Sequence, residues 1–96
     1  DTLLASYHAA IANDLAADKI RLLMKLRKMK ISDTRVLSAI ETIPREAFVE
    51  AAFRDRAYED NALPIAAEQT ISMPSIVAQM SQALDVQPRH MVLEIG

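Results

Sequence analysis

The stretch Met91-Val92-Leu93-Glu94-Ile95-Gly96 decides the fold class of this 96-residue chain. It follows Pro88 and is short, mostly apolar and rich in strand formers, which is typical of a buried β-strand over residues 91–95. A single strand leaves its backbone NH and C=O groups without partners, and even two strands are marginally stable alone. A buried strand that runs into a glycine often starts a nucleotide-binding αβ unit, although VLEIG alone is a weak signal.

Upstream of that strand, the composition predicts a mainly α fold with three to four helices and short extended segments. The chain has one glycine, where ordinary usage of about 7% would give roughly seven, so tight β turns should be scarce. Apolar residues at helical spacing and the positions of proline predict helices from 13 or 14 to 30, from 32 or 33 to 43, from 44 to 50 and from 74 to 85. The first dozen residues allow either a longer first helix or a frayed end, and residues 62–65 and 69–72 are predicted as extended.

The charge balance and the absence of cysteine exclude several classes of protein. Eleven Lys and Arg against thirteen Asp and Glu give a net charge of -2, so we expect no nucleic-acid binding. No apolar run approaches the roughly 18 residues of a membrane span, and no signal peptide is recognised. We expect no metal site, because His8 and His90 are far apart and no carboxylate lies at ligand spacing from either. A chain without cysteine fits a reducing compartment, so we expect a cytoplasmic location.

One charged segment leaves an alternative open. Between Lys19 and Lys30 there are six basic residues and no acid. They form either a solvated helix face or the contact surface of a free-standing helical interaction module that binds an anionic partner such as RNA or an acidic protein. No aromatic residue interleaves with them, as stacking on bases would require.

In the segment Gln69-Thr70-Ile71-Ser72-Met73-Pro74-Ser75, the amide of Gln69 and the hydroxyls of Thr70 and Ser72 lie on an irregular stretch just before a predicted helix. From the residue types alone, Ser72 is predicted to be the N-cap of that helix, and the same location can hold an anion. The adjacent carboxylates Glu59 and Asp60 point to different sides of any regular element, so they are interpreted as a solvated turn rather than an acid and base pair.

Four blocks of sequence together resemble a known family. QTISMPSIVAQM follows AYEDNALPI, DTRVLSAIETIPREAFVE lies upstream, and VLEIG closes the chain. In this order they resemble the N-terminal region of the protein L-isoaspartate O-methyltransferase family, particularly its bacterial members, over about residues 20–96. QTISMP is the most diagnostic block, whereas VLEIG occurs in many Rossmann-like methyltransferases.

The resemblance implies the N-terminal part of an α/β Rossmann-like methyltransferase that uses S-adenosyl-L-methionine. Residues 1–90 would be a helical region that carries a substrate- and cofactor-contacting loop at 62–74, and residues 91–96 would be the first strand and first glycine of the truncated methyltransferase domain. The implied reaction methylates the α-carboxylate of L-isoaspartyl residues in damaged peptides and proteins. The glycine-rich loop and the acidic ribose ligand would lie beyond Gly96, so we expect the 96 residues to be inactive alone.

The resemblance also assigns roles to individual residues. Ser72 would orient the substrate carboxylate as the catalytic residue. The residues implied to contact the cofactor are Gln69, Thr70, Ile71, Glu94 and Gly96, and those implied to contact the substrate are Leu63, Pro64 and Ile65.

Two expectations concern segments that the resemblance places near the site. Family members commonly have glycine where this chain has Ala66, Ala67 and Glu68, a departure that puts a carboxylate near a site for an anionic substrate. We further expect region 62–71 and strand 91–95 to be poorly ordered or paired between chains, so that the fragment self-associates through strand 91–95.

Overall fold

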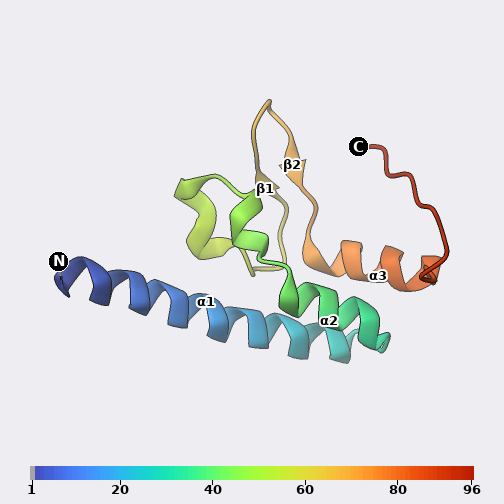
Figure 1. Ribbon diagram of the computed structural model, residues 1–96, viewed down its shortest axis with the longest axis horizontal. Coiled ribbons are helices and arrows are strands. Elements are labelled where there is room, and N and C mark those ends of the chain that lie inside the picture. Colours follow the sequence, from blue (N-terminus) through green and yellow to red (C-terminus); the bar gives the residue numbers. More distant parts are fainter. Residues whose placement is uncertain (1) are drawn as a thin grey trace.

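A long helix, α1 (Thr2–Lys28), runs along the molecule, and the later elements lie on one side of it (Figure 1). The computed structural model describes residues 2–96. Within them, the remaining elements are α2 (Thr34–Thr42), the 3-10 helices η1 (Arg45–Phe48) and η2 (Ala51–Arg56), the strands β1 (Leu63–Pro64) and β2 (Thr70–Ile71), and α3 (Pro74–Leu84). The predicted mainly helical fold class is therefore confirmed.

The core forms where the second half of α1 meets the other elements. Leu22, Leu23 and Leu26 are the buried residues of α1, as the helical spacing predicts. They join a cluster contributed by α2, β1, α3 and the connecting loops, namely Ile31, Leu37, Val49, Ala57, Tyr58, Leu63 and Ala78. The first half of α1 extends past this cluster, so the open question about the first dozen residues resolves as a longer helix from Thr2.

The end of α1 is a Schellman motif. The Ile31 amide donates to the Leu26 carbonyl at 3.0 Å, the Lys30 amide donates to the Arg27 carbonyl at 3.1 Å, and Lys30 has a left-handed φ of 72°. Leu26 and Ile31 are both buried, which is the apolar contact that accompanies this motif.

The second helix begins and ends where the sequence predicts. The Asp33 carboxylate accepts from the Arg35 amide at 2.9 Å as the N-cap, and α2 ends just before Pro44. The predicted third helix is the 3-10 helix η1, in which Phe48 is exposed, while the following Val49 is buried.

Residues 62–71 form an ordered hairpin within the chain, so the expectation that they would be poorly ordered or paired between chains is wrong. β1 and β2 are antiparallel, with Leu63 opposite Ile71 and Pro64 opposite Thr70. The turn is closed by the Gln69 amide, which donates to the Ala66 carbonyl at 3.3 Å. Burial of Leu63 in the core anchors the hairpin, which compensates for its shortness.

Two predictions at the C-terminal side need correction. The N-cap of α3 is Met73, which has no side-chain cap bond, so Ser72 does not cap the helix. Residues 91–96 are exposed and have no regular secondary structure, so the predicted buried strand is absent from the part of the chain that the structure describes. The physical reason is that a strand needs a neighbouring strand, and none lies beside it among residues 2–96. Within the same residues, no helix has the length and apolar character needed to cross a membrane.

Candidate functional site

The hairpin and the start of α3 bring most of the predicted site residues together. β2 leads through Ser72 and Met73 directly into α3, and the hairpin projects away from α1 (Figure 1). Gln69, Thr70 and Ser72 are exposed along this segment. Within residues 2–96, the Ser72 hydroxyl has no hydrogen-bond partner, so it is available to a ligand.

Asp60 fixes the first turn of α3 from the segment that precedes β1. Its Oδ1 accepts from the Ser75 amide at 2.8 Å, and its Oδ2 lies 3.0 Å from the Lys25 ammonium of α1. The side chain is only 6% exposed, which contradicts the prediction that Glu59 and Asp60 both lie in a solvated turn. Burial alone would raise the pKa of Asp60, but the Ser75 amide and the Lys25 ammonium outweigh it and hold the pKa below the usual 3.8.

Arg45 and Tyr58 fix the segment that leads into β1. The Arg45 guanidinium donates to the Ala57 carbonyl at 2.6 Å and to the Asn61 carbonyl at 3.2 Å. The Tyr58 hydroxyl accepts from the Arg45 amide and donates to the Glu46 carboxylate. Burial, together with the bond to Glu46, raises the pKa of Tyr58, and burial lowers the pKa of Arg45. Tyr58 is therefore a neutral hydrogen-bonding group at neutral pH.

An apolar groove of about 530 Å³ lies between α2 and α3 and reaches the predicted site. Its walls include Val36 and Ile40 of α2 and Val77 of α3. Ile71 and Pro74, which flank Ser72 and Met73, also line it. The exposed polar side chains of the hairpin thus stand beside an apolar surface, an arrangement that suits a ligand with both polar and apolar parts.

Comparison with known proteins identifies the family. The family model described as Protein-L-isoaspartate(D-aspartate) O-methyltransferase matches residues 17–96. The chain belongs to this family. It is 60% identical over 78 residues to the protein-L-isoaspartate O-methyltransferase of Rhodospirillum rubrum, 64% identical over 77 residues to that of Paramagnetospirillum magneticum, and 55% identical over 87 residues to that of Cereibacter sphaeroides.

These alignments cover 81%, 80% and 91% of this chain but only 36%, 36% and 40% of the respective relatives. The chain therefore spans well under half the length of the protein-L-isoaspartate O-methyltransferases that it matches.

For this member of the family, the structure separates the predicted site residues into two groups. Leu63, Pro64, Ile65 and the run from Gln69 to Ser72 share one hairpin. Glu94 and Gly96 lie on the exposed C-terminal segment, and within residues 2–96 no hydrogen bond or ion pair joins them to the hairpin. Asp60 and Arg45 were missed from sequence because each of these partners lies 12 or more residues away, beyond any local pattern.

Half of the cations in the basic segment between Lys19 and Lys30 make contacts within the chain. Arg21 pairs with Asp18 and Lys25 with Asp60, while Lys19 donates to the Glu41 carbonyl and lies 5.0 Å from the Tyr58 ring centre. These contacts use three of the six cations between Lys19 and Lys30. The observation disfavours the alternative in which this segment is a continuous surface for an anionic partner.

Proposed function

We propose that this chain is the N-terminal portion of an enzyme that transfers a methyl group from S-adenosyl-L-methionine to the α-carboxylate of L-isoaspartyl residues in damaged proteins. The observation that carries the proposal is the position of the QTIS block. It lies at the junction between β2 and α3 in a family member, with the Ser72 hydroxyl exposed and unbonded within the described residues. Its substrates would be isoaspartyl-containing peptides and proteins, and the cysteine-free composition supports a cytoplasmic location.

The chemistry agrees with the residues that the site offers. A substrate carboxylate with a pKa near 4 is already ionised at neutral pH, so the reaction needs no general base. S-adenosyl-L-methionine, when bound, supplies an electrophilic methyl group on a sulfonium. The protein has to align one carboxylate oxygen with that methyl and exclude water. Ser72 would donate one hydrogen bond to the carboxylate and so select the oxygen that reacts.

Residues of the hairpin and the C-terminal segment fit the remaining roles. Gln69 and Thr70 offer exposed polar groups and Ile71 borders the apolar groove, which suits a cofactor that carries an amino acid and a nucleoside. Glu94 and Gly96 would approach its amino acid end. Leu63, Pro64 and Ile65 would form the wall along which the substrate peptide lies.

In domain terms, residues 1–90 would be the helical region with the contacting loop at 62–74, and residues 91–96 would open the methyltransferase domain. The exposed, unpaired state of residues 91–96 supports this division, because an apolar strand needs neighbours to pair with. Because the relatives are more than twice as long, turnover is expected only from the full-length chain that carries this sequence.

The test is Ser72→Ala in that full-length chain, with methyl transfer to an isoaspartyl peptide as the measurement. We expect kcat/KM to fall roughly 10- to 100-fold, the size of effect that loss of substrate alignment produces. The unfolding midpoint should stay unchanged because Ser72 caps no helix. Ser38→Ala, an exposed serine on α2, is the matched control. A Ser72→Ala variant with wild-type kcat/KM would remove Ser72 from the mechanism.

A further inference from the structure

Asp60 connects three parts of the molecule that are distant in sequence. It lies just before β1, its carboxylate bonds the Ser75 amide of α3, and the same carboxylate pairs with Lys25 of α1. Its neighbour Glu59 is exposed and pairs with Arg56 on the surface. Of the two adjacent carboxylates, therefore, only Asp60 contacts the start of α3.

The first turn of α3 depends on this contact. A helix begins with amide groups that have no partner inside the helix, and the N-cap side chain commonly satisfies one of them. Here Met73 provides no acceptor and Pro74 has no amide hydrogen, so the Ser75 amide is satisfied by Asp60 from 15 residues upstream. Ser75 is buried, so water would not replace the bond readily.

The same contact determines where Ser72 lies. Ser72 and Met73 are the only residues between β2 and α3. The strand end is fixed by pairing with β1, and the helix end is fixed by Asp60 at Ser75. Ser72 therefore lies on a two-residue link, and the Asp60 carboxylate fixes the end of that link that enters α3.

We propose that Asp60, held in place by Lys25, is a positioning residue that fixes the Ser72 hydroxyl relative to the substrate carboxylate. The inference rests on the proposed function. Asp60 touches no reacting atom in this account, since its effect passes through the first turn of α3.

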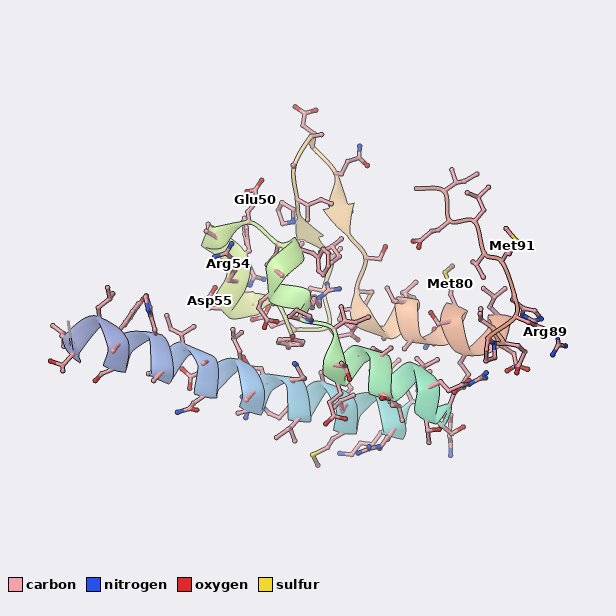
Figure 2. All side chains as sticks on the ribbon, in the orientation of Figure 1. Glu50, Arg54, Asp55, Met80, Arg89 and Met91 are labelled. Carbon is pink, nitrogen blue, oxygen red and sulfur yellow. The ribbon has the colours of Figure 1, made fainter. Side chains whose placement is uncertain are left out.

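Three substitutions separate the parts of this contact. Asp60→Ala removes both the acceptor for Ser75 and the partner of Lys25. Asp60→Asn keeps an oxygen that can accept from the Ser75 amide, because Asn caps helices about as well as Asp, but it loses the ion pair. Asp55→Ala removes an exposed carboxylate on η2, away from α3 (Figure 2), and serves as the control.

Kinetics in the full-length chain test the proposal. We expect Asp60→Ala to lower kcat for methyl transfer about 10-fold or more at a temperature where the variant stays folded, with a smaller change in KM. Asp60→Asn should recover most of the rate, and Asp55→Ala should equal wild type. In a Ser72→Ala background, Asp60→Ala should cause little further loss, because both changes remove the same alignment. Equal losses in both backgrounds would show that Asp60 does not act through Ser72 and would overturn the proposal.

Amide hydrogen exchange of the wild-type chain tests the contact without any variant. The Ser75 amide should be protected although it lies in the first turn of a helix, and rapid exchange there would also overturn the proposal. A full-length wild-type chain that transfers no methyl but protects the Ser75 amide would instead contradict the proposed function. The contact between Asp60 and Ser75 would then stand, but its role in catalysis would be overturned.

Discussion

At the scale of the residue, the scarcity of glycine has a visible structural consequence. Four residues that are not glycine have φ in the left-handed region, at 72° for Lys30, 60° for Ala67, 57° for Glu68 and 49° for Asp85. A side chain in that region costs roughly 1–2 kcal/mol, a penalty that glycine avoids. The only glycine in the sequence is Gly96, so the two helix ends and the hairpin turn all form without it.

The hairpin turn is the place to measure this cost. Glu68→Gly should raise the free energy of unfolding by about 1 kcal/mol, since relief of the left-handed strain exceeds the added flexibility of the unfolded chain. Ala66→Gly is the control, because Ala66 lies in the same turn with an ordinary φ and should lose roughly 0.5–1 kcal/mol. Urea unfolding of both variants provides the comparison. If Glu68→Gly proved as destabilising as Ala66→Gly, the turn would not have the described conformation.

A second residue-scale prediction follows from the depressed pKa of Asp60. A carboxylate whose pKa is lower in the folded than in the unfolded state stabilises the fold above the unfolded value. That stability is lost as the pH falls from about 4 through the lower folded pKa. The charges that face Asp60 are Lys25 from α1 and Arg45 from η1.

Unfolding midpoints between pH 2 and pH 6 measure this contribution. In Asp60→Asn the unfolding midpoint should fall less on acidification than in wild type, whereas in Asp55→Asn it should depend on pH as in wild type. The stability of Asp60→Asn will still depend on pH to some extent, because bonding to Arg35 also lowers the pKa of Asp33. An Asp60→Asn profile that matched wild type would show that the carboxylate is not charged and paired in the folded protein.

At the scale of the element, single polar side chains hold α3 to the segment between α1 and α2. The Gln82 side chain accepts from the Ser32 and Asp33 amides, each at 2.8 Å, and donates to the Lys30 carbonyl at 3.1 Å. Nearby, the Arg35 guanidinium donates to the Val86 carbonyl and pairs with Asp85, both at 2.7 Å. These bonds orient α3, and hence the apolar groove, relative to α2.

Removal of the Gln82 amide should weaken the docking of α3. Gln82→Ala leaves two backbone amides and one carbonyl without their partner, and because these groups are largely open to water we expect a loss of about 1 kcal/mol in the free energy of unfolding. Gln79→Ala, an exposed glutamine on the same helix, should change stability by less than about 0.5 kcal/mol. Equal unfolding midpoints for the two variants would show that the Gln82 bonds do not contribute to the fold.

At the scale of the whole molecule, local sequence patterns predicted where the helices lie better than they predicted which elements pack against each other. Helical spacing located α1, α2 and α3, because the apolar period is a property of one segment. It could not say what covers the apolar face of α3, where Met80 and Leu84 are more than half exposed. The hairpin was missed as an ordered unit because its turn is made without glycine, and Asp60 was missed because its partners are distant in sequence. Within the candidate site, the family resemblance predicted the QTIS block, but nothing in the sequence predicted the contact that Asp60 makes with the start of α3.

The molecule is more extended than a compact domain of its length. Its radius of gyration is 14.9 Å, larger than the roughly 12–13 Å of a compact domain of this length. In Figure 1, the first half of α1 and the C-terminal segment extend away from the other elements. In Figure 2, Met80 extends from α3 on the side along which the segment with Met91 runs. Met80 and Leu84 of α3 and Met91 and Leu93 of the C-terminal segment are all more than half exposed, and we refer to these four apolar residues together as the α3 surface.

We propose that the isolated 96-residue chain self-associates through the α3 surface, because exposed apolar side chains promote contact between copies. Sedimentation over a dilution series should show concentration-dependent association, and Met80→Lys combined with Leu93→Lys should shift the chain to monomer. Ile20→Lys is the matched control, since Ile20 is an exposed apolar residue on α1 and its change should leave association intact. A monomer at every concentration would contradict the prediction, and dissociation by Ile20→Lys alone would move the contact to α1. In the full-length chain the same lysine pair should instead lower stability, because there the surface would be covered by the rest of the protein.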